Sequence, residues 1–238
     1  MTVSTSMPTS AAPPEAASDD AAAAKIALSW THTARFLTTA SALSQLPVSE
    51  LPEIAFVGRS NAGKSTAINV MTQQKRLAFA SKTPGRTQHI NLFELGPKLA
   101  PDALFADLPG YGYAAVERNA KLRWQEVMAS YLDVRRSLSA IVVLVDSRLG
   151  FTDMDKKLLG FVSTRVANGS VRLLTLLTKV DKLNRRDAAI ALKAAADVLA
   201  EVTTEESVVA LTAFSSLSRA GVDDAARTLY DWVHGAPR

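Results

Sequence analysis

The sequence predicts an α/β fold built on a mostly parallel, six-stranded sheet with one antiparallel edge strand and helices on both faces. The main observation is that, past residue 50, short apolar or β-branched runs alternate with longer segments of helical character. Strand and helix in turn imply right-handed crossovers and a sheet that is covered on both sides. In addition, 238 residues with 47% hydrophobic content can bury one core of ordinary size. We therefore expect a single folded domain.

Six runs have the length and composition of strands. They lie near residues 53–58, 89–95, 103–108, 139–146, 171–178 and 207–214, and helices are expected near 64–72, 117–135, 153–167, 185–201 and 219–233. Only the short "GPKLAP" separates the second run from the third, which is too little for a crossover helix. These two strands should therefore form an antiparallel hairpin at one edge of the sheet.

The start of the chain differs in composition from the rest. It is built from Ala, Ser, Thr and Pro and cannot bury enough surface to offset the entropy of ordering, so we predict a disordered tail over residues 1–25 and a folded domain over 26–238. Residues 1–24 carry Glu15, Asp19 and Asp20 and no Lys or Arg, so the net charge of +4 becomes +7 for the remainder of the chain. A polyanionic partner and a solvated basic surface are both compatible with this balance.

The composition also excludes several classes of protein. The chain has no cysteine, which rules out disulfide scaffolds, thiolate catalysis and cysteine zinc sites. No apolar run approaches the roughly 18 residues that cross a bilayer, and the tail lacks the features of a secretory or transit signal. We expect a soluble, cytoplasmic protein with no membrane partner.

The stretch "GRSNAGKST" lies between the first predicted strand and the first predicted helix, and it matches the phosphate-binding pattern G-x-x-x-x-G-K-[ST]. Glycines let the backbone fold tightly, so that successive N–H groups and the helix N-terminus point at one anion. The lysine then reaches the outer phosphates, and the serine hydroxyl can bind Mg²⁺. The alternative is a glycine-rich turn with a surface lysine. The residues concerned are Gly58, Arg59, Ser60, Asn61, Ala62, Gly63, Lys64 and Ser65.

Two further motifs follow strands of the predicted sheet. "DLPG" (Asp107, Leu108, Pro109, Gly110) ends the third strand, where its carboxylate can hold Mg²⁺ through water and its glycine N–H can meet the terminal phosphate. "TKVD" (Thr178, Lys179, Val180, Asp181) ends the fifth, and a carboxylate at Asp181 can accept two hydrogen bonds from guanine but not from adenine. Lys179 would lie along the base. "FSS" (Phe214, Ser215, Ser216) ends the sixth strand and could supply N–H groups to the guanine O6. Each of these motifs, taken alone, could equally be an ordinary polar turn.

Taken in order, "GRSNAGKS", "TPGRTQ", "DLPGYGYA", "TKVD" and "FSSLSRAG" resemble the five guanine-nucleotide motifs of a GTPase related to translation factors. More narrowly, the chain resembles the EngB family of bacterial ribosome-assembly GTPases, also called YihA or YsxC, within the TrmE-Era-EngA-EngB group of P-loop GTPases. "PGRTQHINLFE", "DLPGYGYAAV" and "VLVDSRLGFTDMD" carry this narrower resemblance, which runs from "ARFLTTA" at residue 34 to "LYDWV" at residue 233.

The resemblance implies roles that spacing alone does not give. Thr87 matches the switch threonine that binds Mg²⁺ together with Ser65, and the loop around the nucleotide consists of Gly85, Arg86, Thr87, Gln88 and His89. Lys64, Thr87 and Gly110 are the implied catalytic groups. The implied activity is slow hydrolysis of GTP to GDP by a monomer that acts in assembly of the large ribosomal subunit. A part in cell division and septation is implied by the family alone.

Three positions stand out against the general GTPase pattern. Tyr111 replaces the glutamine that orients the attacking water, so intrinsic turnover should be slow. Thr178 replaces the usual asparagine, so we expect the side-chain amide that braces the loops to be missing and nucleotide binding to be weakened. Asn61 could help to hold a K⁺ ion beside the phosphates, or it could simply tolerate a turn conformation.

Basic residues gather near the predicted switch segments, at Lys75, Arg76, Lys82, Arg86, Arg118, Lys121 and Arg123. If they share one face, the nucleotide state could expose or hide a surface for rRNA and ribosomal proteins. Two other functions stay open. One is an ATP-dependent P-loop kinase or ATPase, and the other is a nucleotide-gated scaffold in which hydrolysis matters little.

Overall fold

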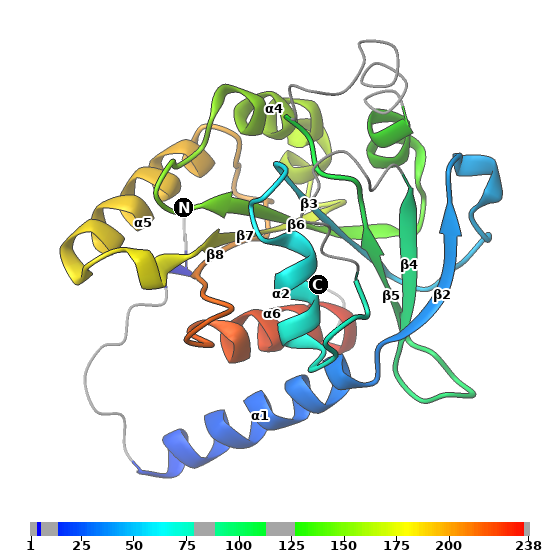
Figure 1. Cartoon of the computed structure of the whole chain (residues 1–238), viewed down its shortest axis with the longest axis horizontal. Helices are drawn as coiled ribbons and strands as arrows, with labels where there is room; N and C mark the ends of the chain where they lie inside the picture. The colour runs from blue at the N-terminus through cyan, green and yellow to red at the C-terminus, as the bar shows by residue number, and fades with distance from the viewer. Residues whose placement is uncertain (1–3, 6–13, 79–88, 113–126, 236–238) are drawn as a thin grey trace.

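A single eight-stranded sheet organises the part of the chain that the structure, a computed structural model, describes: residues 4–5, 14–78, 89–112 and 127–235. The strand order is β1-β8-β7-β6-β3-β5-β4-β2 (Figure 1). The strands are β1 (Ser4–Thr5), β2 (Arg35–Ala40), β3 (Glu53–Gly58), β4 (Ile90–Leu95), β5 (Ala103–Asp107), β6 (Leu138–Asp146), β7 (Arg172–Thr178) and β8 (Val209–Ala213). From β1 to β5 along this order, neighbouring strands pair in parallel.

Helices cover both faces of this sheet. They are α1 (Pro14–His32), α2 (Lys64–Met71), α4 (Asp153–Ala167), α5 (Arg185–Ala200) and α6 (Val222–His234), and residues 127–134 are also helical. One buried cluster joins α4, α5 and the segment 127–134 to one face, and a second joins α1, α2 and α6 to the other. Within the described ranges, no helix combines the length and the apolar character that crossing a bilayer requires.

The predicted fold class is confirmed, and all six predicted strands are present within one or two residues of their expected ends. The predicted hairpin is also correct, since β4 runs antiparallel to β5 with Asn91 opposite Asp107. The expected helix over residues 117–135 is described only from residue 127 onward.

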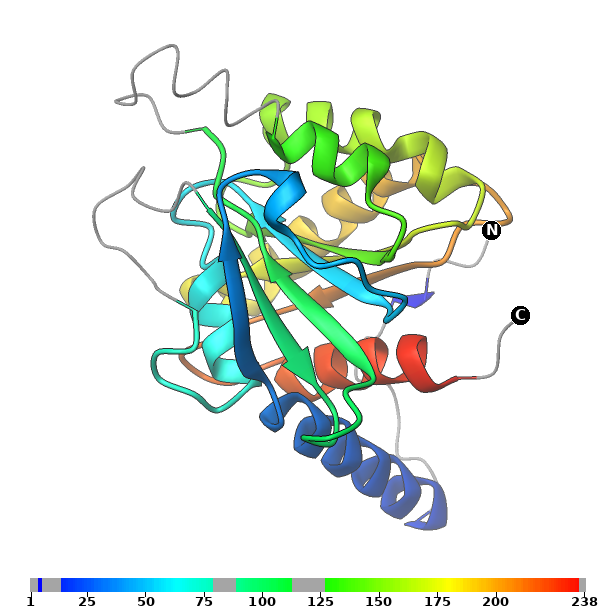
Figure 2. The same ribbon diagram turned by 90° about the vertical axis from the view of Figure 1, so that its right-hand side faces the viewer.

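The edge of the sheet differs from the prediction. β2 pairs outside β4 in antiparallel register, so the antiparallel strand is not the last one (Figure 2). Most β2 side chains are exposed or half-buried, and so the strand lacks the apolar run by which the others were recognised. Its Arg35 forms an ion pair with Glu94 of β4 at 2.9 Å.

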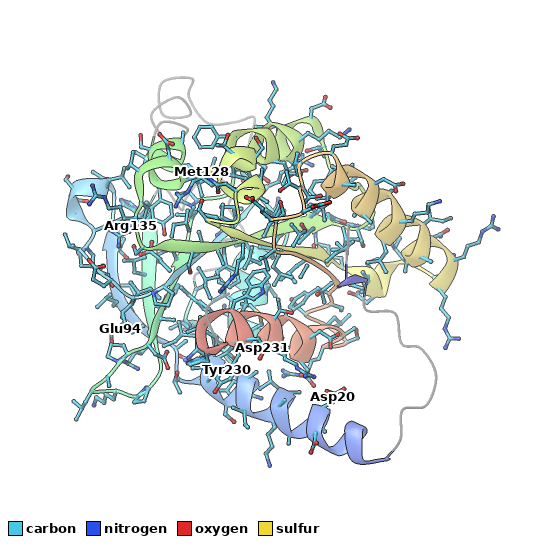
Figure 3. The ribbon with its side chains drawn as sticks, turned by 180° about the vertical axis from the view of Figure 1, so that it is seen from behind. Asp20, Glu94, Met128, Arg135, Tyr230 and Asp231 are labelled. Carbon is cyan, nitrogen blue, oxygen red and sulfur yellow. The ribbon has the colours of Figure 1, made fainter. Side chains whose placement is uncertain are left out.

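The start of the domain also differs from the prediction. Residues 14–25, expected to be disordered, belong to α1, because alanine has the highest helix propensity and the C-terminal half of the helix packs against the core. The Trp30 indole lies edge-on to Phe105 and Tyr230, with ring centroids 5.9 and 5.7 Å apart, and its Nε1 donates to Asp102 at 2.8 Å. Figure 3 shows α1 and α6 side by side with Tyr230 between them. The domain boundary at residue 26 stays a prediction.

Parallel strands bring their carboxyl ends to the same edge of the sheet, which is where ligands bind in folds of this kind. β3, β5, β6, β7 and β8 all end there. The beginning of β3, at the opposite edge, is fixed by a buried carboxylate: Glu53 accepts hydrogen bonds from Arg135 at 2.8 and 3.1 Å and from the Tyr131 hydroxyl. The loop that follows β3 therefore leaves a strand whose beginning is held in place.

Candidate nucleotide-binding site

The loop between β3 and α2 leaves a group of main-chain N–H groups without helical partners. Gly63, immediately before α2, has φ 99°, a left-handed conformation that glycine adopts without strain. The first helical bond runs from the Ala67 N–H to Gly63 O at 2.8 Å, so the N–H groups of Lys64, Ser65 and Thr66 precede it. A helix N-terminus exposed in this way is suited to bind an anion.

Gly58 is required for a different reason, namely space. A Cβ at this position would lie 2.9 Å from the carbonyl oxygen of Leu144 on β6. Any larger residue would therefore push the start of the loop away from the sheet. Gly58 thus sets the position of the loop, and Gly63 sets its curvature.

Lys64 and Asp107, which the sequence assigned to phosphate and metal, lie together. The Lys64 ammonium forms a buried ion pair with Asp107 Oδ1, and the two side chains are 8% and 0% exposed. The other oxygen, Asp107 Oδ2, is also buried and has no hydrogen-bond partner among the described residues. Both groups lie where the outer phosphates are expected. The lone pairs of Asp107 Oδ2 can accept a hydrogen bond from a ligand or from water bound to it.

The "DLPG" segment lies directly against the phosphate loop. The Tyr111 N–H donates to Gly58 O at 3.2 Å, and the Ser60 N–H donates to Tyr111 O at 2.8 Å. A Cβ at Gly110 would lie 3.2 Å from the Cα of Ser60, so a larger residue there would require the phosphate loop to shift by a few tenths of an ångström. Leu108 and Pro109 are buried beneath the turn.

The motif at the end of β7 is joined to the phosphate loop by two hydrogen bonds. The Thr178 hydroxyl donates to Ala62 O at 2.7 Å, and the Lys179 ammonium donates to Asn61 O at 2.7 Å. This corrects the expectation that replacing asparagine by Thr178 leaves the loops without a side-chain brace. The short Thr178 hydroxyl reaches the Ala62 carbonyl because β7 ends close to the phosphate loop. The longer amide side chain of an asparagine is therefore not needed.

Asp146, at the end of β6, is a member of the site that sequence reasoning missed. Its carboxylate accepts from the Lys179 ammonium at 2.8 Å and from the Arg148 guanidinium at 2.7 and 2.9 Å. These hydrogen bonds, with that from Arg148 the stronger cause, hold the pKa of Asp146 well below its usual range. The sequence could have pointed to Asp146, because it is an acidic residue at the end of a buried strand, as Asp107 is. No role was assigned to it from the sequence.

Asp181 lies at the surface, beyond Lys179, and Ser215 fixes its orientation. The Ser215 hydroxyl donates to Asp181 Oδ1 at 2.6 Å, which lowers the pKa of that carboxyl, and Lys182 lies 3.4 Å from Oδ2. The N–H groups of Phe214 and Ser215 already donate to Leu177 O and Ala220 O. The expectation that these two N–H groups serve the guanine O6 is therefore wrong, and Ser216 is left as the candidate donor.

The remaining predicted residues are only partly described. Gly85, Arg86, Thr87 and Gln88 lie outside the described residues, whereas His89 is exposed just before β4 and Val180 is half-buried after Lys179. Of the predicted basic cluster, Lys75 and Arg76 are described, and the other five residues are not.

Replacing Thr178 with valine should weaken nucleotide binding about fivefold, because one hydrogen bond of about 1 kcal/mol no longer holds the phosphate loop. Titration with a fluorescent guanine nucleotide measures this change. Thr175→Val is the matched control, since Thr175 is also buried on β7 and its hydroxyl has no partner among the described residues. Equal losses in the two variants would show that the brace has no specific effect.

A phosphate loop before α2, faced by a buried lysine and aspartate and tied to a second loop whose carboxylate is held by a serine hydroxyl, defines a P-loop nucleotide-binding protein. Residues 53–179 match a family model described as a 50S ribosome-binding GTPase. The chain belongs to the EngB family of GTP-binding proteins, and it is a GTPase.

Sequence relatives support this assignment over most of the chain. The chain is 55% identical to a probable GTP-binding protein EngB of a Polaromonas species, over 94% of this chain and 88% of the relative. It is 58% identical to the protein of the same name from Acidovorax ebreus, over 87% and 91%.

Solved structures show the same fold at low sequence identity. A crystal structure of a probable GTP-binding protein engB has a TM-score of 0.56 at 19% identity, covering 77% of this chain and all of that one. Era in complex with MgGDPNP and a 16S ribosomal RNA segment has a TM-score of 0.60 at 19% identity, covering 79% of this chain and 59% of that one.

Proposed function

We propose that this GTPase hydrolyses GTP slowly and uses its two nucleotide states to time its association with precursors of the large ribosomal subunit in the cytoplasm. The observation that supports nucleotide binding is the pair of hydrogen bonds from Thr178 and Lys179, at the end of β7, to the phosphate loop. The ribosomal part is supported by the description of the matching family model as a 50S ribosome-binding GTPase. We propose further that the protein acts as a monomer and, by family, supports cell division and septation.

In this proposal the phosphates lie in the loop from Gly58 to Ser65, and Mg²⁺ is bound by Ser65 and Thr87, with Asp107 reached through water. Asp107 Oδ2, which is buried and has no hydrogen-bond partner within the described ranges, fits a hydrated cation. Bound Mg²⁺ neutralises charge on the phosphate oxygens. Lys64 exchanges its partner Asp107 for the outer phosphates, and the Gly110 N–H meets the terminal phosphate. By the family resemblance, Gly85 to His89 form the loop around the nucleotide.

The base lies between Lys179 and the loop of Phe214 to Ser216. Asp181 accepts from the N1–H and the exocyclic amine of guanine, and the Ser216 N–H is the donor for its O6. Adenine would leave the Asp181 carboxylate unpaired, which costs a few kcal/mol. Fixing of Asp181 by Ser215 supports this selectivity because the carboxylate is oriented before the base arrives.

Slow hydrolysis follows from the position of Tyr111. Its hydroxyl donates to Asp155 Oδ1 at 2.7 Å, so its proton is not available to orient an attacking water. No described side chain at the site is an obvious general base. Rate enhancement then comes from positioning and electrostatics, through Lys64, Thr87 and Gly110.

Asn61 could add a monovalent cation to the site. Its φ of 68° agrees with a simple turn role, and its exposed side chain leaves a K⁺ role open as well. Hydrolysis assayed in KCl and in NaCl separates the two roles, and equal rates would remove the K⁺ role.

Binding to isolated large-subunit precursors should depend on both nucleotide and salt. In a co-sedimentation assay, a non-hydrolysable GTP analogue should increase the bound fraction relative to GDP. Affinity should fall at least about 10³-fold between 50 and 200 mM salt if six or more rRNA phosphates are contacted. Binding that responds to neither variable would contradict the proposal.

A nucleotide-gated scaffold is the alternative that one observation favours, because the Tyr111 hydroxyl is bound to Asp155 and does not take the place of the water-orienting glutamine. If a Thr87→Ala protein still binds GTP and supports subunit assembly as well as wild type, the scaffold gains and the metal-coupled switch loses. The less favoured ATPase or kinase is tested by comparing labelled GDP with labelled ADP.

A further inference from the structure

Tyr111 is fixed through its main chain and through its side chain. Its N–H and carbonyl groups both bond the phosphate loop, at Gly58 and Ser60. Its ring is buried, only 3% exposed, in the cluster beneath α4. Burial, together with the carboxylate of Asp155, raises the pKa of the Tyr111 hydroxyl well above its ordinary value, so the hydroxyl stays protonated and donates.

Asp155 is the acceptor, and its two oxygens have separate partners. Oδ2 accepts from the N–H of Thr152 at 2.8 Å and from its hydroxyl at 2.6 Å, which closes the first turn of α4. Oδ1 accepts from Tyr111 alone among the described residues, at 2.7 Å. The side chain is only 1% exposed. Asp155 therefore links the start of α4 to the residue that follows Gly110.

Asp155 and Tyr111, the two partners in this hydrogen bond, each line a cavity. A cavity of about 200 Å³ lies on one side, lined by Arg59, Ser60 and Asp155 among others. A second, of about 190 Å³, is lined by Tyr111, Met154 and Leu158 among others. Because each of the two groups borders open space, the hydrogen bond between them adds to core packing in fixing the position of the ring.

We propose that Asp155 is a positioning residue for GTP hydrolysis. By holding the Tyr111 hydroxyl, it fixes the main chain of Gly110 where its N–H meets the terminal phosphate. The inference rests on the proposed role of Gly110 and adds to it a residue on α4 that touches neither nucleotide nor metal. GDP lacks the γ-phosphate, the group that the Gly110 N–H is proposed to meet, so GDP affinity should not depend on this hydrogen bond.

The test compares Tyr111→Phe with Tyr111→Phe/Asp155→Asn in the full chain. Three quantities are measured: the single-turnover rate of GTP hydrolysis, the affinities for GDP and for a non-hydrolysable GTP analogue, and the melting temperature. Tyr111→Phe should lower the rate and the analogue affinity about tenfold each, with GDP affinity unchanged. It should also lower the melting temperature, because Asp155 Oδ1 is left buried and unpaired.

The double variant separates positioning from stability. An asparagine at position 155 can still accept from Thr152 but carries no buried charge, so the melting temperature should recover while hydrolysis stays slow. Asp153→Asn is the matched control, because Asp153 is in the same turn but exposed, and it should hydrolyse GTP as wild type does. Recovery of hydrolysis together with melting temperature, or a Tyr111→Phe rate within twofold of wild type, would overturn the inference.

Gly110→Ala distinguishes this inference from the proposal on which it rests. If Gly110→Ala hydrolyses GTP normally, the proposed role of Gly110 fails, and the inference fails with it. If Gly110→Ala is slow and Tyr111→Phe is normal, only the role of Asp155 fails.

Discussion

An Asp181→Asn protein is expected to bind xanthosine diphosphate more tightly than GDP. The asparagine amide cannot accept from the N1–H and the exocyclic amine of guanine together, so GDP affinity should fall about 100-fold, a loss of about 3 kcal/mol. Xanthine carries a carbonyl in place of that amine and can accept from an amide N–H. The Ser215 hydroxyl, which donates to Oδ1, should keep the asparagine oxygen turned inward and its NH₂ toward the base.

Competition between labelled xanthosine and guanosine diphosphates measures this change of preference. Asp197→Asn is the matched control, since Asp197 is exposed on α5 and its substitution makes the same change of charge. A loss of GDP binding with no gain for the xanthine nucleotide would mean that Asp181 does not contact the base edge.

Lys64→Met should remove hydrolysis and also destabilise the nucleotide-free protein. The Lys64 ammonium is the ion-pair partner of the fully buried Asp107. Removing one member of a buried ion pair leaves an uncompensated charge, which typically costs about 3–5 kcal/mol. Denaturant unfolding without nucleotide should show this loss, and single-turnover kinetics should show the loss of hydrolysis.

The two effects can be separated by removing the second charge as well. A Lys64→Met/Asp107→Asn protein should regain much of the lost stability, because no buried charge is left unpaired, but it should not regain hydrolysis. Lys156→Met, an exposed position on α4, controls for the loss of a lysine. Should Lys64→Met unfold at the wild-type denaturant concentration, the ion pair would not form in the nucleotide-free protein.

Local sequence predicted those parts of the fold and the site whose determinants are close together in the chain. The buried strands were recognisable as apolar runs, and Gly63 and Lys64 as parts of one short motif. Lys64 and Asp107 were each assigned to phosphate and metal, and the structure brings them together because they follow neighbouring parallel strands.

The parts that were missed depend on contacts between distant residues. Tyr111 and Asp155 are 44 positions apart, and Thr178 and Ala62 are 116 apart. No spacing rule predicts such a pair. The brace was misjudged because the chemistry of residue 178 was considered without the distance to its acceptor. β2 was missed because most of its side chains are exposed or half-buried. α1 was missed because its first half consists mainly of alanine and small polar residues, a composition that was interpreted as disorder.

The hydrogen bonds from Thr178 and Lys179 to the carbonyls of Ala62 and Asn61 join two loops without any contribution from a nucleotide. The cradle is thus assembled while the chain folds, and a ligand that arrives does not have to immobilise it. Some of the affinity of this protein for its nucleotide is therefore already determined by the stability of the empty domain.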